Sequence, residues 1–212
     1  MKNMMIFGIL SLALLFSSSN WISINGNNLE NENIRVNSSD IFKTNLTFEI
    51  DSFNFNDVEG ENGKIVRLQE GAQLLQHGAP DLPQLATSII IPDDQAMEVN
   101  IISSNYIDFE NIEILPSKGN ISRLIDPSTI PFEYGPSYSQ NEFFPGKLQE
   151  LREPYILRDI RGITVVIYPI QYNPVSKTLR VYNEIVVEIS SIGRDINNVL
   201  NRENLPDTRP FE

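Results

Sequence analysis

Residues that could carry catalysis are scarce in this sequence. It contains no cysteine, and His77 is its only histidine. Thiol nucleophiles, cysteine-type metal sites and histidine clusters for zinc are therefore excluded. Paired carboxylates remain, as in glycoside hydrolysis, and the candidate pairs are Asp93–Asp94 and Glu59–Glu61. Both pairs lie in turns marked by glycine or proline, where acidic side chains are ordinarily solvated, so we expect a chain that is not an enzyme and holds neither metal nor cofactor.

The arginines indicate a different chemistry, the recognition of a partner's carboxylate. A guanidinium presents five donors in a planar fork that matches a carboxylate at two points. Arg123 stands at the head of a long segment rich in glycine, proline and aromatic residues, and Arg152, Arg158 and Arg161 lie close together further on. The ordinary expectation for each is a surface ion pair that contributes little stability. An arginine on a loop held at both ends by packed aromatic residues would instead be presented to an acidic pocket.

The N-terminus has the pattern of a secretory signal peptide, which we assign to residues 1–19. Lys2 precedes an apolar run from Met4 to Phe16, and Ser17 to Ser19 supply small residues after it. This run is too short to span a membrane comfortably, so we expect a secreted chain, periplasmic or extracellular, with no membrane contact once the signal is removed. The net charge is −12, from 16 basic and 28 acidic residues. Nucleic acid and anionic membranes are therefore poor partners, because they are bound through lysine and arginine.

The strongest structural signal is a long hairpin predicted over residues 163–190. Two runs rich in valine, isoleucine, tyrosine and threonine flank residues 173–177, where Asn173-Pro174 opens a turn. Further strands are predicted over residues 46–55, 64–68, 85–91, 97–104, 106–114 and 154–159. Short strands separated by turn signals, with no heptad or internal repeat, favour an all-β fold. We predict an antiparallel β-sandwich or a barrel-like variant of it, with little helix.

The sequence divides into three parts after the signal peptide. Residues 20–40 are dominated by Asn, Ser and acidic residues and predict a flexible N-terminus, residues 41–191 a β-sandwich domain, and residues 192–212 a polar tail or linker. Within the domain, residues 115–145 are rich in glycine and proline and predict a long irregular excursion. Its aromatic residues predict that this excursion is ordered and packed: Phe132, Tyr134, Tyr138, Phe143 and Phe144.

Six motifs follow one another along the chain. They are GAPDLPQL (78–85), LPSKGNISR (115–123), IPFEYG (130–135), FFPGKL (143–148), LREPYILRDIRG (151–162) and YPIQYNPVSKTLRVYNEIVVEI (168–189). In this order and spacing they resemble the N-terminal propeptide of the gingipain-type cysteine peptidases of clan CD, family C25. The resemblance covers the chain from about Phe48 to Ile189, which is far more specific than any single motif.

The resemblance implies a β-sandwich prodomain of a secreted bacterial peptidase. Such a prodomain assists the folding of the catalytic domain and inhibits it, keeping it latent until the prodomain is cut away. In arginine-specific members of the family, the arginine of an SKG-x-x-x-R loop occupies the peptidase's specificity pocket. The matching position here is Arg123, with Lys118 and Gly119 in the same inhibitory loop.

The implied partner is the catalytic domain of a gingipain-like cysteine peptidase. If that partner cuts after arginine, Arg194 and Arg202 in the polar tail are candidate processing sites. Precursors of the family continue into a catalytic domain that carries the cysteine and histidine. The sequence therefore leaves open an isolated prodomain, a truncated precursor or a free-standing inhibitor-like protein.

A second interpretation comes from a different functional class. An exported β-sandwich module could bind carbohydrate or another surface ligand through the aromatic residues of the 115–145 excursion, if their rings were exposed on one plane. The competing expectation is that these rings pack beneath the long loop, and the sequence favours this expectation.

Overall fold

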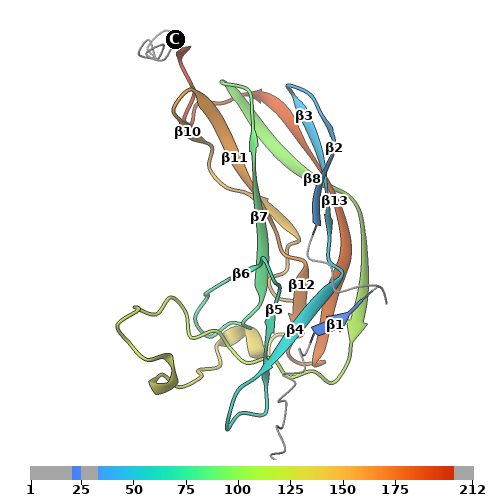
Figure 1. The fold of residues 1–212 in the computed structure, drawn as a ribbon, viewed down its shortest axis with the longest axis vertical. Helices are drawn as coiled ribbons and strands as arrows, with labels where there is room; N and C mark the ends of the chain where they lie inside the picture. Colours follow the sequence, from blue (N-terminus) through green and yellow to red (C-terminus); the bar gives the residue numbers. More distant parts are fainter. Residues whose placement is uncertain (1–20, 25–32, 203–212) are drawn as a thin grey trace, which may run out of the picture.

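The fold is built from antiparallel strands, with two single-turn 3-10 helices, η1 (Pro127–Thr129) and η2 (Pro136–Ser139). It is seen in a computed structural model, which describes residues 21–24 and 33–202. Figure 1 shows an elongated molecule in which the long strands run together along the vertical axis. The predicted all-β antiparallel fold with little helix is confirmed.

The larger sheet is organised around its longest strand, β13 (Thr178–Arg194). Residues 179–194 of β13 pair with β8 (Gln95–Phe109) on one edge. The other edge pairs first with β12 (Ile170–Asn173) and then with β3 (Lys43–Glu49), which in turn pairs with β2 (Asn33–Ser39). Because both edges of β13 are paired, its backbone is satisfied along almost its whole length.

A second sheet faces the first and is centred on β11 (Ile160–Ile167). One edge of β11 pairs with β7 (Pro83–Ile90), which continues to the short β6 (Ala72–Gln73). The other edge pairs with β9 (Gln149–Leu151) and β10 (Tyr155–Leu157). A third, small sheet consists of β1 (Trp21–Ser23), β4 (Ser52–Asp57) and β5 (Lys64–Arg67).

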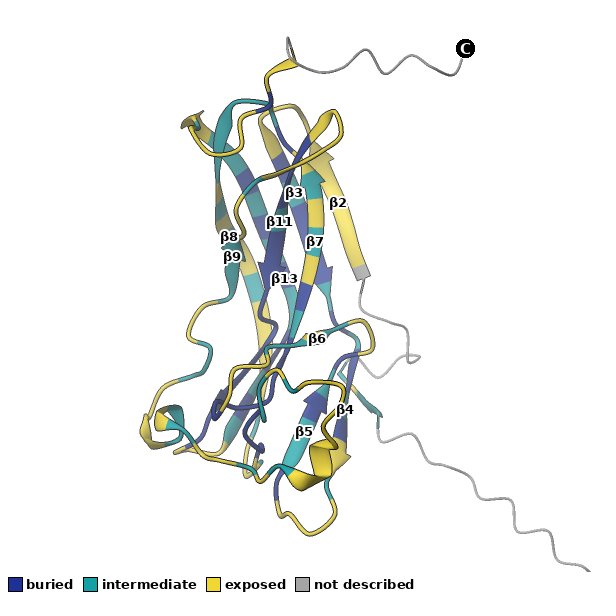
Figure 2. Cartoon of the chain, turned by 90° about the vertical axis from the view of Figure 1, so that its left-hand side faces the viewer, coloured by how far each residue is buried: buried dark blue, intermediate teal, exposed yellow. Residues whose placement is uncertain are grey.

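The core lies between the sheets and follows the alternation of the strands. On β13 the odd-numbered apolar residues Leu179, Val181, Ile185, Val187 and Ile189 are all buried. They pack in one cluster with buried side chains of β3, β4 and β11. In Figure 2 the buried positions lie on the central strands, such as β13 and β11, and exposed positions lie on the edge strand β2 and in the loops at both ends of the molecule. Burying each such side chain contributes about 1.5–3 kcal/mol, so this alternation decides which face of β13 turns inward.

The predicted 163–190 hairpin is only partly correct. A true hairpin joins β12 to β13, and its turn is held by the side chain of Asn173, which accepts hydrogen bonds from the N–H groups of Val175 (3.0 Å) and Ser176 (3.2 Å). The first predicted arm, however, is split between two sheets, because β11 belongs to the second sheet and β12 to the first. The break falls at Tyr168-Pro169, where proline has no N–H to extend the β11 ladder.

The predicted boundaries of the ordered domain are wrong at both ends. Residues Asn33–Ser39, assigned to a flexible N-terminus, form strand β2 on the edge of β3. Such an exposed edge strand has polar composition, so composition alone did not distinguish it from a flexible segment. At the other end, β13 continues to Arg194 and residues 195–202 dock against the sandwich, where a polar tail was expected. The predicted signal peptide, residues 1–19, lies outside the described residues.

In the described parts of the chain, no helix is long and apolar enough to cross a membrane.

Replacing Phe53 by alanine is expected to lower the free energy of unfolding by about 3–5 kcal/mol. Its ring is fully buried and makes edge contacts with Phe55 (5.2 Å between ring centroids) and Phe109 (5.3 Å). Urea unfolding followed by circular dichroism measures the change. Ile102→Ala, at a β8 position that is 58% exposed, is the control and should change stability by less than about 0.5 kcal/mol. Equal effects of the two changes would contradict the core described above.

Candidate functional site

The segment that carries Arg123 is a loop clamped at its base, and we call residues 117–135 the Arg123 loop. Its first leg pairs with the turn before β7: the N–H of Ser117 donates to the carbonyl of Ala79 (2.7 Å), and the N–H of Gly78 donates to that of Ser117 (3.0 Å). Its second leg returns to the same turn, where the N–H of Gly135 donates to the carbonyl of Gly78 (2.8 Å). Both ends of the loop are therefore fixed to one another through a single short segment.

Glycine is required where these backbones meet. Gly78 has φ +75° and Gly119 has φ +78°, a region that side chains rarely adopt. A Cβ on Gly135 would lie 2.9 Å from the carbonyl oxygen of Gly78. A Cβ on Gly119 would lie 3.1 Å from that of His77. The predicted loop residue Gly119 thus shapes the start of the loop.

Lys118 closes the loop from inside. Its Nζ donates to the carbonyl oxygen of Pro127 (2.8 Å) and lies 4.0 Å from the ring centroid of Phe132. Asp126 caps the adjacent helix η1 by accepting from the N–H of Ser128 (2.9 Å), a bond that lowers the pKa of Asp126 below its usual value. The ammonium group of Lys118 is therefore used within the chain, and sequence reasoning missed its two partners.

Arg123 sits at the tip of the loop. The N–H of Ile125 donates to the carbonyl of Ser122 (3.0 Å), which makes a turn with Arg123 and Leu124 at its corner. Arg123 is exposed and forms no hydrogen bond or ion pair with any other described residue, while Leu124 is 95% exposed. In Figure 1 this part of the chain projects from the lower end, away from the long strands. An arginine in this position can enter an acidic pocket without first breaking a contact of its own.

The rest of the 115–145 excursion is ordered and packed, as predicted. The hydroxyl of Tyr138 donates to the carbonyl of Ile114 (2.8 Å), and Tyr134 stacks edge-on against Tyr138. The guanidinium of Arg180 lies 4.2 Å from the ring centroid of Phe143. Phe144 exchanges two backbone hydrogen bonds with Tyr172, both 2.9 Å long. Tyr138 and Phe144 also pack against the hydrophobic core, whereas Tyr134 is 60% exposed. Most of these rings are therefore engaged with the protein itself, which supports the packing interpretation over the ligand platform.

A pocket of about 360 Å³ lies beneath the Arg123 loop, between it and strands β5 and β6. Asp81 lines this pocket and is only 8% exposed. Burial raises the pKa of Asp81, and the hydrogen bond from Gln73 (2.7 Å) together with the charge of Arg67 opposes this rise. The N–H of Asp81 also donates to the carbonyl of Leu115 (3.0 Å), so this carboxyl belongs to the base of the loop.

The carboxylates and the histidine considered for catalysis are either paired within the protein or exposed in turns. Asp93 is bound by both nitrogens of the Arg202 fork (2.6 and 3.1 Å), and Asp94 accepts from the amide of Gln95 (2.8 Å). Glu59 and Glu61 are exposed in the β4–β5 turn, which agrees with the expectation of solvated turn residues. The Nε2 of His77 lies 3.6 Å from Glu133, and both side chains are more than half exposed. Over residues 21–24 and 33–202, no three acidic or histidine side chains gather in a way that could hold a metal ion.

The remaining arginines do not join Arg123. Arg152 pairs with Glu150 (2.6 Å) at the surface, as expected, and Arg158 is exposed in the turn between β10 and β11. Arg161 was expected to be a surface residue, and this is wrong: its side chain is fully buried. Arg194 and Arg202, the candidate processing sites, lie at the end of the sandwich opposite the Arg123 loop (Figure 1).

Comparison with known proteins places this chain in a family. Residues 27–207 match the family model Propeptide_C25. The chain belongs to this family of propeptides. It is 43% identical to gingipain R1 of Porphyromonas gingivalis over 176 residues, and 41% identical to gingipain R2 of the same species, strain ATCC 33277, over 162 residues. These matches cover 82% and 76% of this chain but only 18% and 22% of the relatives, so the chain spans about a fifth of their length.

A solved relative has the same fold. The structure described as a complex of the Porphyromonas gingivalis RgpB pro- and mature domains superposes with a TM-score of 0.75 at 38% identity. The match covers 78% of this chain and 89% of the matched chain. The resemblance inferred from the six motifs is thereby confirmed, and this chain corresponds to the prodomain of a gingipain-type peptidase rather than to its catalytic part.

The Asp81→Asn variant should be more stable than the natural chain at neutral pH and lose this advantage in acid. The folded state binds the Asp81 proton more tightly than the unfolded chain, because burial raises its pKa. Stability linked to Asp81 therefore increases as the pH falls through the folded-state pKa, whereas the buried charge is destabilising at higher pH. Asparagine keeps the acceptor for Gln73 and removes the charge. Thermal unfolding of both proteins between about pH 4 and pH 8 measures the difference in their stability. A difference that stays constant across this range would contradict a raised pKa of Asp81.

Lys118→Met should loosen the Arg123 loop without unfolding the sandwich. Methionine keeps the length of the side chain but removes the donor to Pro127 and the cation over Phe132, together about 1–2 kcal/mol. Hydrogen exchange should accelerate within residues 120–129. Lys43→Met, which removes a surface pair with Glu188 on the larger sheet, is the control and should leave these amides unchanged. Unaltered exchange in Lys118→Met would show that another contact closes the loop.

Proposed function

We propose that this chain inhibits the catalytic domain of a gingipain-like cysteine peptidase, keeping it latent, and assists its folding. Arg123 is the group that we assign to the specificity pocket of the peptidase. The observation that carries the assignment is its position: an arginine without a partner among the described residues, at the tip of a turn, on a loop fixed at both ends. The arginine matches the SKG-x-x-x-R pattern through Ser117, Lys118 and Gly119.

The geometry suits a substrate-like inhibitor. The guanidinium fork of Arg123 can be held by a carboxylate through two parallel hydrogen bonds. Leu124 and Ile125 follow it with exposed apolar surface, and the clamped base reduces the entropy that is lost when the loop is bound. Inhibition then requires only that the bound loop is cleaved slowly or that its products remain in place.

Lys118 and Gly119 shape the loop in this proposal and do not contact the peptidase. The ammonium of Lys118 is already engaged with Pro127 and Phe132, and Gly119 supplies a positive φ close to His77. Their effect on inhibition is exerted through the conformation in which Arg123 is presented.

Two further observations support the choice of partner. The solved relative is a complex of pro- and mature domains, so a domain of this fold binds a peptidase domain there. The net charge of −12 also favours a partner with a basic face, which would accelerate association. We assign the same export route to both, on the basis of the predicted signal peptide at residues 1–19.

Arg123→Ala should weaken inhibition of an arginine-specific gingipain-type peptidase at least about 30-fold, which corresponds to about 2 kcal/mol, a typical value for a central interface arginine. Inhibition by Arg123→Lys should be intermediate between that of the natural chain and that of Arg123→Ala, because an ammonium keeps the charge but lacks the planar fork. The inhibition constant is measured by titrating the intact chain against a chromogenic arginine substrate.

Arg158→Ala is the matched control, since Arg158 is also exposed but lies in the β10–β11 turn at the other end of the sandwich. It should inhibit like the natural chain. Equal inhibition by Arg123→Ala would remove Arg123 from the pocket, and a natural chain that does not inhibit at all would refute the latency role. Refolding the denatured catalytic domain with and without this chain tests the folding role, which predicts a higher yield of active peptidase with it.

A further inference from the structure

The end of the sandwich opposite the Arg123 loop is covered by the chain itself. After β13 ends at Arg194, residues 195–202 cross this end, and we call them the C-terminal strap. The N–H of Asp195 donates to the carbonyl of Asp94 (2.8 Å), and the N–H of Leu200 donates to that of Asp93 (2.9 Å). Leu200 is 5% exposed, so the strap is held by an apolar anchor as well as by its backbone.

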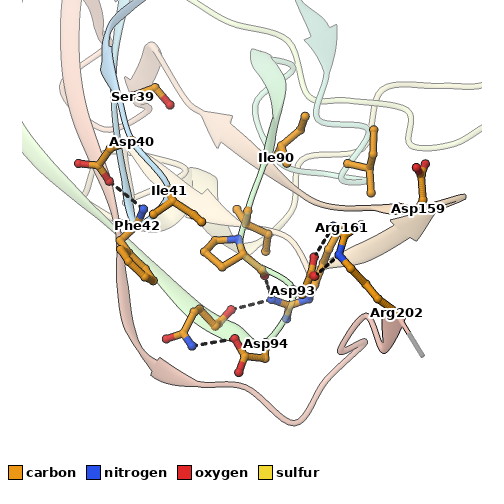
Figure 3. Close-up of a pocket in the computed structure, with 14 residues that line it drawn as sticks. Ser39, Asp40, Ile41, Phe42, Ile90, Asp93, Asp94, Asp159, Arg161 and Arg202 are labelled. Atoms are coloured by element: carbon orange, nitrogen blue, oxygen red, sulfur yellow. Dashed lines mark hydrogen bonds and ion pairs between the residues drawn. The ribbon is translucent and has the colours of Figure 1, made fainter. Parts of the chain in front are cut away.

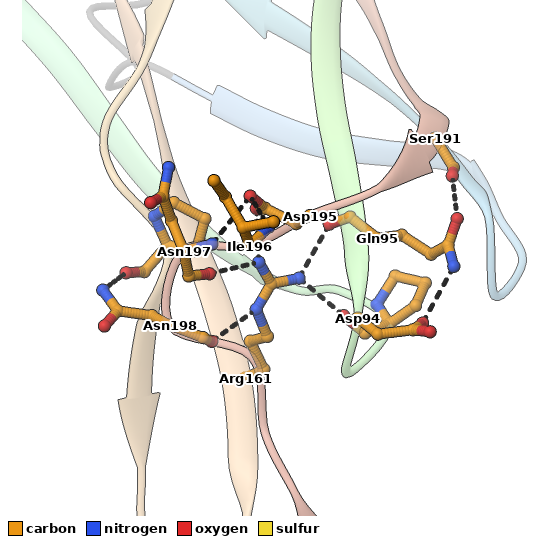
Figure 4. Close-up of polar contacts among 10 residues, drawn as sticks. Asp94, Gln95, Arg161, Ser191, Asp195, Ile196, Asn197 and Asn198 are labelled. Carbon is orange, nitrogen blue, oxygen red and sulfur yellow. Dashed lines mark hydrogen bonds and ion pairs between the residues drawn. The ribbon is translucent and has the colours of Figure 1, made fainter.

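A buried arginine holds the first half of the strap. Arg161 uses all five of its N–H donors. Figure 4 shows its guanidinium between the strap and the segment that joins β7 to β8, with hydrogen bonds to both. Nε donates to the carbonyl of Asn198 (2.8 Å), and the second terminal nitrogen donates to the carbonyl of Asn197 (3.0 Å) and to the carboxylate of Asp195 (2.6 Å). The first terminal nitrogen donates to two carbonyls, that of Pro92 (2.9 Å) in the β7–β8 turn and that of Gln95 (2.7 Å), the first residue of β8.

The carboxylate of Asp195 is itself fully engaged. It also accepts from the N–H groups of Ile196 (2.8 Å) and Asn197 (3.0 Å), and these bonds, the one from Asn197 first, and the charge of Arg161 lower its pKa below the usual value. Arg161 is buried, so removing Asp195 would leave a buried guanidinium without its counter-charge, which is strongly destabilising. The strap is therefore part of the support of the fold.

A second arginine closes the other end of the strap. Arg202 donates to both oxygens of Asp93 (2.6 and 3.1 Å) at the edge of a pocket of about 700 Å³ that is also lined by Ile41, Ile90 and Ile160 (Figure 3). This pair is at the surface, since the Arg202 side chain is 60% exposed. Release of the Arg202 side chain requires the loss of this ion pair and of no strand pairing.

The two arginines thus differ in what an arginine-specific peptidase would have to undo. Such a peptidase must extend the substrate backbone and take the arginine side chain into its pocket, so a folded site is cut only after local opening. At Arg202 the side chain has to leave Asp93. At Arg194 the side chain has to leave Asp94 (3.7 Å), the backbone has to leave its pairing with Gln95, and Asp195, on the other side of the bond, has to leave Arg161.

We propose that the C-terminal strap is a latch that sets the order of cleavage: a peptidase cuts after Arg202 first and after Arg194 only once the strap has been released. Each cut is a hydrolysis, in which the C–N bond after the arginine breaks and water supplies OH to the carbonyl carbon and H to the new amine. The first cut leaves the strap bound and the sandwich intact. The second cut separates Asp195 from β13, so the strap can dissociate and Arg161 loses its carboxylate partner. The prodomain then unfolds. The proposal rests on the proposed function only in that the partner cuts after arginine.

Limited proteolysis of the whole chain with trypsin tests the latch without the cognate peptidase. Cleavage sites are quantified by mass spectrometry at early times, with the exposed Arg123 as internal reference. Acidic residues follow both bonds, Asp195 and Glu203, so the two sites are matched at this position. The natural chain should be cut after Arg202 before it is cut after Arg194.

Two variants open the two parts of the latch separately. Asp93→Asn should increase cleavage after Arg202 about fivefold relative to Arg123, the factor expected for losing a good surface pair, with little effect at Arg194. Asp195→Glu should increase cleavage after Arg194 at least about tenfold, since the longer side chain moves the carboxylate away from the buried Arg161 while an acidic residue still follows the scissile bond. Asp108→Asn is the matched control, because it breaks a similar two-bond pair with Arg180 (2.8 and 2.8 Å) outside the strap.

The fold of each product is followed by circular dichroism and thermal unfolding. The product cut only after Arg202 should melt at the same temperature as the uncut chain. The product cut after Arg194 should melt at a lower temperature or be unfolded. Equal cleavage of the natural chain at both sites, or an effect of Asp93→Asn no larger than that of Asp108→Asn, would overturn the proposal. Because trypsin replaces the partner, failure here leaves the inhibitory role of Arg123 untouched, and loss of that role leaves this result untouched.

Discussion

The pairing of β13 on both edges is the constraint on which the rest of the structure depends. A buried strand has to satisfy its N–H and C=O groups, and β13 does so along almost its whole length with β8 on one side and with β12 and β3 on the other. Three register shifts along the β8 pairing let this 17-residue strand bend while its apolar face stays on the core. Its two ends define the two ends of the molecule. The segment before the Arg123 loop bonds to Lys177 at one end, and the C-terminal strap begins at Arg194 at the other.

The Arg123 loop shows how an irregular segment becomes rigid without regular structure. Close contact between Gly78 and Gly135 joins its two legs, and Lys118 ties the first leg to Pro127 and Phe132. Each contact is local and modest, and at the tip the side chain of Arg123 forms no hydrogen bond or ion pair with another described residue. Preorganisation of this kind lowers the entropic cost of binding, which is why a short exposed turn on a large scaffold is suited to occupy a pocket.

Arginine has opposite roles at the two ends. Arg161 uses its five donors inside the protein and holds the chain together, whereas none of the donors of Arg123 is bound by another residue of the described ranges 21–24 and 33–202. Arg180 is intermediate, since it pairs with Asp108 and lies between the rings of Tyr106 and Phe143. Desolvation decides among these roles: a guanidinium can be buried only where carbonyls and carboxylates replace its water, and it is available for recognition only where they do not.

Much of this could be read from the sequence by itself. Alternating apolar residues and turn signals predicted the all-β class, the lack of cysteine excluded thiol chemistry, and the glycines and aromatics of residues 115–145 indicated an ordered excursion with Arg123 at its head. These features are local, or depend on a period of two that any strand must follow. Other features depended on the tertiary structure, because they join residues far apart in the chain. The crossing at Pro169 between two sheets, the recruitment of β2 as an edge strand, and the burial of Arg161 by residues 92–95 and 195–198 are decided by which segments meet in space, and side-chain type does not specify that.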